Sequence, residues 1–482
     1  METRSQGPVS QLLPPSSVKK ASLSAGDIIV HKEKPVREPL SGAYFWLTLF
    51  FAVYCARPED WIPGLHVIPL AKITGVCAAI GFVLSIRHSR RRLQKLPREA
   101  LYLLLMIALL FLSAVLSPLW RGGAFSRTLD FSKVFVAWVI AYIAVTNFER
   151  LRRIIFIQTA SVAVVSIVSI LKGHSHPRLR GALGGIYSNP NDLAFAIVLS
   201  LPFCIAFMLK AQTIPRKAAW AFAMLVMAAA IFSTASRGGF ITLLVVAPVC
   251  LWHFAIKKQR IHLIIAAVLI LTVVGVAGGG RLMDRFFAIS GEDLDTGIER
   301  RAHGSYEDRW YLMNRSLEAI ARYPLLGVGV GNFMSFSGEW RNVHVAYLQI
   351  AAEGGIPVLI LYLMFFARGF SNLRRMRRIS KSDPDIELFA GALHSSLVGF
   401  LVGALFLPEA YIYFPYFGVS FTAVLLAIVK EQQDKKSEFE SQHGKIGQNG
   451  DIGTITSSPI VGLIRQLEME GKEHLDLAVE FC

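Results

Sequence analysis

Cysteine is scarce in this sequence, with five residues among 482. Cys55, Cys77, Cys204 and Cys250 lie in or beside apolar runs, where cysteine usually packs as a small hydrophobic residue. Cys482 is the last residue, so it does not form a prenylation motif, which needs three further residues. No CxxC pair and no cysteine–histidine spacing typical of a metal site occurs. The sequence therefore predicts neither a metal ion nor another cofactor.

Other common signatures of soluble enzymes are also missing. Gly327, Gly329 and Gly331 match neither GxGxxG nor a P-loop, because no strand precedes them and no GK[ST] follows, which argues against nucleotide binding. No Ser-His-Asp or paired-carboxylate arrangement stands out. Residues 1–40 are polar and rich in Ser, Pro and Lys, so we expect a disordered tail there and no cleavable signal peptide.

Long apolar runs dominate what is present. Apolar residues make up 53% of the chain, mean hydropathy is +0.47, and charge falls between the runs. Runs of roughly 17–25 residues match the thickness of a hydrocarbon core of ~30 Å, which excludes a soluble globule. The pattern predicts an all-α polytopic membrane protein with about twelve spans. They lie near 42–56, 66–86, 99–117, 130–146, 153–171, 192–209, 217–233, 239–256, 261–279, 344–367, 387–407 and 411–429.

The net charge of +16 follows from topology rather than from nucleic-acid binding, because the basic residues are spread over alternate short loops. These loops follow the even-numbered spans, for example at 87–98, 150–153, 257–260 and 368–381. By the positive-inside rule they are cytoplasmic, as are both termini, including a polar C-terminal tail at 431–482. A transmembrane domain at 41–430 with one large periplasmic loop at 280–343 is therefore predicted.

Three arginines lie on the outer side against this rule, which favours a functional role for them. Arg178 and Arg180 belong to the segment RLRGALGGIYSNPNDLA, residues 178–194. There, Asn191 or Asp192 is suited to cap the helix expected from Leu193. A helix N-terminus beside two arginines suits a phosphate group, while arginines bound to lipid headgroups are the simpler alternative.

Arg237 is the third of these arginines and lies in STASRGGF, residues 233–240, between two apolar runs. An arginine this close to hydrocarbon costs about 2.5–3.5 kcal/mol on insertion scales unless it is paired or near the interface. The neighbouring Gly238 and Gly239 allow a ligand to approach the backbone closely. A snorkelling arginine that anchors the helix end is the equally simple alternative.

The large loop contains one predicted helix, which begins at a capping box formed by Ser305 and Asp308 and stops at Pro324. An amphipathic helix on the membrane surface and a helix packed on the ends of the spans explain its pattern equally well. Asp308 and Arg309 are either part of a site or a surface pair.

His344 lies where the large loop re-enters the membrane, in NVHVAYLQIAAEGGIP. Its imidazole is placed to act as a general base on a hydroxyl, although a lone interfacial histidine more often packs and hydrogen-bonds locally. Glu353, in the same predicted span, either balances an arginine or pairs within its helix.

The chain resembles the O-antigen ligase and polymerase family of bacterial inner-membrane glycan transferases. The resemblance rests on GGIYSNPNDLA, on SRGGF after an apolar span, on PLLGVGVGNF at the end of the large loop, and on HVAYLQIAAEGGIP directly after it. It covers about residues 40–430. Many members carry Asn after the histidine, where this chain has Val345.

The resemblance implies a GT-C-like fold and a metal-independent, inverting glycosyltransferase. It implies a polyprenyl-diphosphate-linked glycan donor and an acceptor hydroxyl on a glycan, lipid A core or protein, at the periplasmic face of the inner membrane. By the resemblance, His344, Arg237 and Arg180 are catalytic, with Arg180 favoured over Arg178. The expected substrate-binding residues are Arg178, Asn191, Asp192, Asp308 and Arg309. A polymerase of the same family and, from another class, a transporter or flippase remain alternatives.

Overall fold

The computed structural model describes residues 40–88, 95–172, 179, 187, 189–265, 268–269, 272, 297–339, 341–379, 383–408 and 410–448. Within these residues every regular element is helical, as the sequence predicts. The long helices are α1 (Ser41–Ala56), α3 (Leu70–His88), α4 (Arg98–Val115), α5 (Arg121–Ala144), α6 (Phe148–Lys172), α7 (Pro190–Lys210), α8 (Ile214–Thr234), α9 (Arg237–Leu251), α12 (Gly297–Arg322), α15 (Ile356–Ile379), α16 (Pro384–Gly403) and α17 (Tyr413–Gln448). Shorter elements are α2 (Pro58–Trp61), η1 (Leu65–Val67), η4 (Trp252–Ile256), α13 (Phe333–Ser337) and α14 (Ala346–Gly354).

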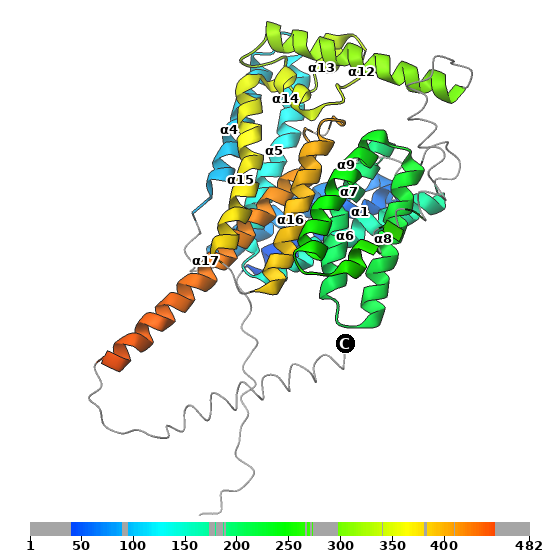
Figure 1. Ribbon diagram of the computed structural model, residues 1–482. Coiled ribbons are helices and arrows are strands. Elements are labelled where there is room, and N and C mark those ends of the chain that lie inside the picture. Colours follow the sequence, from blue (N-terminus) through cyan, green and yellow to red (C-terminus); the bar gives the residue numbers. More distant parts are fainter. Residues whose placement is uncertain are drawn as a thin grey trace, which may run out of the picture. The chain divides into compact units, whose positions relative to one another are not determined.

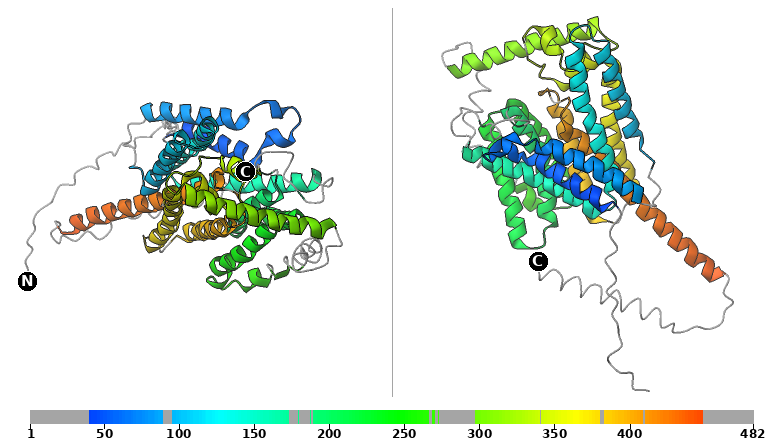
Figure 2. Two further views of the ribbon diagram at one scale, coloured as in Figure 1. Left: turned by 90° about the horizontal axis from the view of Figure 1, so that it is seen from above. Right: turned by 180° about the vertical axis from the view of Figure 1, so that it is seen from behind.

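Nine helices of the described chain are long and apolar enough to cross a membrane. Two further helices coincide with predicted spans but fall outside this set: α1 has 16 residues, and α5 begins with polar residues such as Arg127 and Asp130. The predicted span at 261–279 lies mostly outside the described residues. The helices pack side by side in one bundle, while α12 crosses over one of its ends (Figures 1 and 2).

Helix α4 illustrates how the bundle is packed. Leu103, Met106 and Leu110 on one face are buried, while Leu101 and Leu112 on another face are exposed, as expected for a helix with one side toward lipid. Since lipid tails are as apolar as leucine, membrane helices gain stability from close contact instead. The described bundle achieves this through small residues and through an aromatic core that includes Tyr362, Tyr416 and Phe400.

The two ends of the bundle differ in character. At one end, which we name the basic end, Lys210 pairs with Asp385, and Lys257 and Lys258 pair with Glu387. These pairs join the C-terminal end of α7 and the end of η4, which follows α9, to the start of α16. At the opposite end, which we name the histidine end, the N–H of Ala346 donates to the carbonyl of Ala404, two residues from His344.

The predicted span at 344–367 is wrong, because two helices replace it. α14 ends at Gly354, and α15 begins at Ile356 after Gly355, whose φ is 84°. A contact with the chain after α12 stabilises the break, since the N–H of Ile356 donates to the carbonyl of Pro324 at 2.8 Å. His344 therefore precedes a short helix at the histidine end, and the membrane-spanning helix begins twelve positions later.

The helix of the large loop also starts earlier than predicted. α12 runs from Gly297, so Ser305 lies inside the helix and does not cap it; the predicted stop before Pro324 is confirmed. Leu312 and Ala319 of α12 pack against Val328 and Ala352, while Trp310 remains 53% exposed. The helix thus covers the histidine end and keeps an aromatic residue outside.

We expect Gly355→Ala to lower the free energy of unfolding by about 3 kcal/mol, because this backbone conformation is nearly restricted to glycine and a Cβ atom would lie 2.4 Å from the carbonyl oxygen of Leu325. Gly338→Ala is the matched control: its φ is 79°, but nothing lies within 4 Å of a Cβ atom there, so a loss of about 1–2 kcal/mol is expected. Thermal unfolding in detergent measures both. Equal losses would contradict the role assigned to the Leu325 contact.

Candidate functional site

Two helix N-termini meet at the histidine end. Asn189 caps α7 by accepting a hydrogen bond from the N–H of Asn191 at 3.0 Å, and Ser236 caps α9 by accepting from the N–H of Gly239 at 3.1 Å. The hydroxyl of Ser236 donates to the side-chain oxygen of Asn191 at 2.8 Å, which joins the two N-termini. Helix N-termini carry partial positive charge, so their junction favours an anion.

The expected cap of α7 is wrong by two or three residues. The helix begins at Pro190, and Asn189 is its cap, whereas Asn191 and Asp192 lie in the first turn. The side-chain oxygen of Asn191 instead accepts the hydrogen bond from the hydroxyl of Ser236. Its role is therefore to connect two segments that are 45 residues apart.

The glycines of SRGGF allow this junction. A Cβ atom on Gly239 would lie 2.6 Å from Cβ of Ala194 on α7, and one on Gly238 would lie 2.7 Å from Cβ of Phe406, beyond the end of α16. Real Cβ atoms do not approach this closely, so a larger residue would push α9 away from both neighbours. Arg237, the first residue of α9, is held between these close contacts and is partly buried.

A positively charged group of side chains lies around His344. Arg309 of α12 lies within electrostatic range of both Arg237 and His344. Arg341 also acts on His344 and forms an ion pair with Asp308. Residues 237, 308, 309, 341 and 344 thus come together from α9, α12 and the segment before α14.

Burial and two arginines keep His344 neutral. Desolvation, then the charges of Arg309 and Arg341, lower the pKa of His344 to about 4, while Asp308 opposes them. Within the described residues its buried Nδ1 atom has no hydrogen-bond partner. A neutral imidazole beside arginines is able to accept a proton at pH 7.

Arg178 and Arg180 lie outside the described residues, but two neighbours are described. The N–H of Leu179 donates to the carbonyl of Ser233 at 3.1 Å, near the end of α8, and the hydroxyl of Tyr187 donates to the carbonyl of Cys55 at 2.8 Å, near the end of α1. These two residues connect the segment to α8 and to α1.

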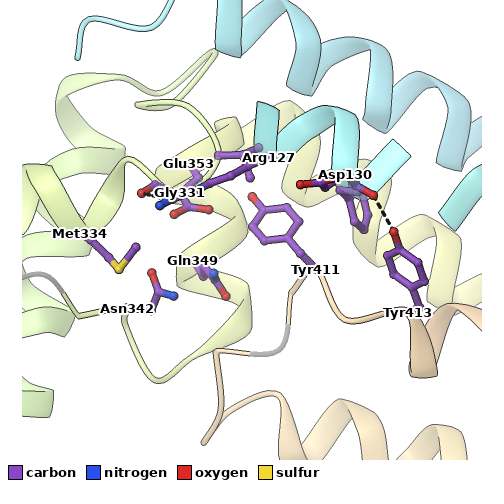
Figure 3. A pocket seen from close by; sticks show the side chains of 11 residues that line it. Arg127, Asp130, Gly331, Met334, Asn342, Gln349, Glu353, Tyr411 and Tyr413 are labelled. Atoms are coloured by element: carbon purple, nitrogen blue, oxygen red, sulfur yellow. Dashed lines mark hydrogen bonds between the residues drawn. The ribbon is translucent and has the colours of Figure 1, made fainter. Parts of the chain in front are cut away.

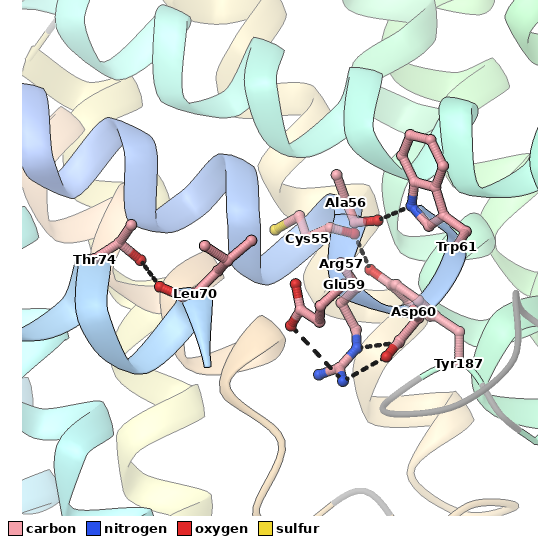
Figure 4. A network of polar contacts seen from close by, with 9 residues as sticks. All are labelled: Cys55, Ala56, Arg57, Glu59, Asp60, Trp61, Leu70, Thr74 and Tyr187. Carbon is pink, nitrogen blue, oxygen red and sulfur yellow. Dashed lines mark hydrogen bonds and ion pairs between the residues drawn. The ribbon is translucent and has the colours of Figure 1, made fainter. Parts of the chain in front are cut away.

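The turn that receives Tyr187 is itself held by polar contacts (Figure 4). Arg57 pairs with Asp60 and lies 3.9 Å from Glu59, and the indole N–H of Trp61 donates to the carbonyl of Ala56 at 2.8 Å. Because Arg57 is satisfied by two acids of its own turn, we assign it to the scaffold of the site.

Glu353 and Arg127 form a second polar group at the same end. Glu353 is fully buried on α14, and the charge of Arg127, from α5, acts on its carboxyl. The guanidinium of Arg127 also donates to the carbonyl of Gly331, in the turn formed by Gly327, Gly329 and Gly331, whose φ values are all positive. Of the two alternatives for Glu353, the described contacts show no ion pair within its helix, and the charge of Arg127 acts on the carboxyl without an ion pair.

Sequence reasoning missed Arg127 and Arg341. Arg127 lies between the third and fourth predicted spans, on the outer side, so the argument that selected Arg237 would also have selected it. Arg341 precedes His344 by three residues, but its partner Asp308 is 33 residues away, and only the fold brings them together.

Part of the chain that carries these residues matches a known family. Residues 222–363 match the family model described as O-antigen ligase. The match confirms the resemblance of the sequence to this family and includes Arg237, Asp308, Arg309 and His344. GGIYSNPNDLA lies outside the matched residues. No curated protein gives a significant match.

The match and the nine apolar helices together indicate a multi-pass membrane protein with ligase- or polymerase-like glycan transfer. The family relation implies a lipid-linked glycan and an acceptor as partners in general terms.

Proposed function

We propose that the protein transfers a glycan from a polyprenyl-diphosphate carrier to an acceptor hydroxyl at the outer face of the inner membrane. The observation that carries this proposal is the meeting of Arg237, Arg309 and His344, from three distant segments, at the end opposite the basic residues. The basic end faces the cytoplasm by the positive-inside rule, so the histidine end faces the periplasm.

The arginines suit the leaving group of this reaction. When the bond between the anomeric carbon and the diphosphate oxygen breaks, negative charge grows on the diphosphate. Guanidinium groups fixed beside that oxygen, together with the N-termini of α7 and α9, stabilise this charge most strongly in the transition state. Arg237 and Arg309 have this role in the proposal, and Arg180, which lies outside the described residues, would join them.

His344 suits the other half of the reaction. The acceptor oxygen attacks the anomeric carbon as the diphosphate leaves, and the proton of the acceptor hydroxyl passes to the neutral imidazole. A single displacement of this kind inverts the anomeric configuration. Asn191 and Asp192 would support the anion-binding junction, and Asp308 would orient Arg341.

The test uses the full-length protein in liposomes that contain a lipid-linked glycan from the host bacterium and the acceptor lipid fraction. One polyprenyl diphosphate is expected to be released for each glycan transferred, also in the presence of EDTA. Product length then separates a ligase, which leaves the repeat number unchanged, from a polymerase, which produces a ladder. Movement of the glycan across the bilayer without release of the carrier would contradict the proposal and favour a flippase.

The pH profile gives a separate test of the histidine. Because the folded protein lowers the pKa of His344, the base stays neutral as pH falls, and kcat/KM is expected to decline only below about pH 5. Bound diphosphate adds negative charge, so the decline in kcat should occur at higher pH. Asp308→Asn removes the charge that raises this pKa and should move the decline in kcat/KM to lower pH. A wild-type decline centred near pH 6.5 would contradict this environment for His344.

A further inference from the structure

A cavity lies at the histidine end, between α5, the glycine turn, α14 and the loop before α17 (Figure 3). Its volume is about 300 Å³, at the lower end of the range for small-ligand sites. It is separate from the Arg237 junction, since α5 and α14 lie on one side of α16 and α7 and α9 on the other (Figure 1).

The lining of this cavity suits a neutral, hydroxyl-rich ligand. Arg127 supplies donors, the carboxyl of Glu353 supplies acceptors, and the amide of Asn342 supplies both. The amide nitrogen of Gln349 supplies a further donor, while its Oε1 atom accepts from the N–H of Ala410 at 3.4 Å. The carboxylate of Asp130 is paired with Lys133, and the charge of Arg127 acts on the carboxyl of Glu353, so neither a phosphate nor a cation finds an excess of opposite charge here. A sugar ring needs this mixture of donors and acceptors, and the aromatic residues of the cavity offer a surface for its apolar face.

Several polar atoms of the lining have no hydrogen bond within the described residues. They are both carboxyl oxygens of Glu353, the hydroxyl of Tyr411 and the side-chain oxygen of Asn342, and all are buried. The Tyr411 hydroxyl and the backbone N–H groups of Gly331 and Phe333 lie beside the carboxyl of Glu353, without hydrogen bonds of ordinary geometry. Native proteins rarely leave buried polar groups unsatisfied, so this concentration in one cavity points to a ligand.

The chain links this cavity to the reaction proposed above. Asn342 precedes His344 by two residues. Gln349 and Glu353 lie on α14, which starts two residues after His344. The arginines proposed for the donor diphosphate lie toward α9. An acceptor in the cavity would therefore lie beside the segment that carries His344.

We propose that this cavity binds one sugar ring of the acceptor glycan, whose hydroxyl groups bond to Glu353, Gln349 and Asn342. The identity of the ligand as an acceptor rests on the proposed function; the binding of a sugar does not. Burial raises the pKa of the Glu353 carboxyl to about 7, against the opposing effects of the Gly331 N–H, the Tyr411 hydroxyl and the charge of Arg127. The group is therefore able both to donate to and to accept from sugar hydroxyls near neutral pH.

A binding experiment tests the sugar site directly. The probes are the methyl glycosides of glucose, galactose and N-acetylglucosamine, and saturation-transfer NMR detects their binding to the purified full-length protein. We expect binding of at least one to the wild type and to His344→Ala, and at least a fivefold weaker signal with Glu353→Gln. Met334→Trp, which fills the cavity from a partly buried wall position, should have the same effect without removing a polar group.

Glu99→Gln is the matched control, because Glu99 is also a buried carboxylate but lies on α4 beside Arg368, away from the cavity. It should leave the NMR signal unchanged. Equal signals for the wild type, Glu353→Gln and Met334→Trp would overturn the proposal, as would a fall in thermal stability of Glu353→Gln with sugar binding intact, which would indicate a purely structural carboxyl.

Kinetics in liposomes then distinguish the two possible sources of the sugar. For Glu353→Gln and Met334→Trp we expect at least a tenfold higher KM for the acceptor and less than a twofold change for the donor. The reverse pattern would overturn the assignment to the acceptor. If the wild type bound the glycosides but transferred no glycan, the proposed function would fail while the sugar site remained.

Discussion

Substitution of His344 by alanine is expected to lower the rate of glycan transfer by about 10³-fold, within the range typical for loss of a general base. The neutral imidazole is the side chain proposed to take the proton of the acceptor hydroxyl, and no water is fixed in its place by the substitution. The loss should appear mainly in kcat, because the donor diphosphate is bound by the arginines. Steady-state transfer in liposomes, with donor and acceptor varied separately, measures this.

His66→Ala is the matched control for this substitution. His66 is an exposed histidine in η1, in the loop after α1, and lies outside the described group around His344. Its replacement should leave transfer unchanged. Thermal unfolding should also be nearly unchanged in His344→Ala, because the buried Nδ1 atom has no partner within the described chain to be left unpaired. A His344→Ala protein that kept half of the wild-type rate would remove His344 from the mechanism.

The membrane-spanning helices could be predicted because the sequence pattern that marks each of them, an apolar run, is local. Each apolar run is bounded by charge, and the length of the run is set by the bilayer. The break at Gly355 was not predictable in this way, since residues 344–367 form one largely apolar run in which Glu353 is the acidic residue. What decides the break is the contact with Pro324 and Leu325, which are distant in the sequence.

For the N-terminal cap of α7, the sequence contains the residue that decides the start of the helix, although the prediction placed the cap at Asn191 or Asp192. Both Asn189 and Asn191 are suitable caps, but Pro190 is favoured at the first position of a helix and so marks Asn189 as the cap. The start of α12 is different: the predicted cap at Ser305 has the right residue types, but the helix continues to Gly297 without it.

The candidate site was predicted from the membrane side expected for each arginine and from the order of the family-like motifs along the chain, not from three-dimensional contacts. An arginine on the outer side is unusual whatever it binds, and this singled out Arg237 before any contact was known. The proximity of Arg309 to both Arg237 and His344, and the pairing of Arg341 with Asp308, depend on how α12 lies across the bundle. The hydropathy of the chain predicts only the spans. It contains no information on how α12 packs, because α12 lies outside them.

Substitution of Arg237 by alanine is expected to lower kcat/KM for the lipid-linked donor by about 10²–10³-fold, the usual loss when one preorganised donor to a developing charge is removed. Both kcat and the donor KM should change, since the diphosphate is charged before and after the bond breaks. Arg121→Ala is the matched control: Arg121 is an exposed arginine at the start of α5, whose guanidinium donates to the carbonyl of Ser117 at 3.3 Å. It should transfer glycan at the wild-type rate.

Arg237→Lys separates phosphate binding from anchoring of the helix end. A lysine snorkels to the membrane interface as well as an arginine does, so an anchoring role would be fully restored by it. A lysine presents a point charge and does not form two parallel hydrogen bonds to a diphosphate, so a catalytic role would be restored only in part. We expect an intermediate rate for Arg237→Lys at normal protein abundance in the membrane. Full activity of the lysine variant, with low abundance of the alanine variant, would assign Arg237 to anchoring α9. Of the described arginines proposed to bind the diphosphate, Arg309 would then remain in the mechanism.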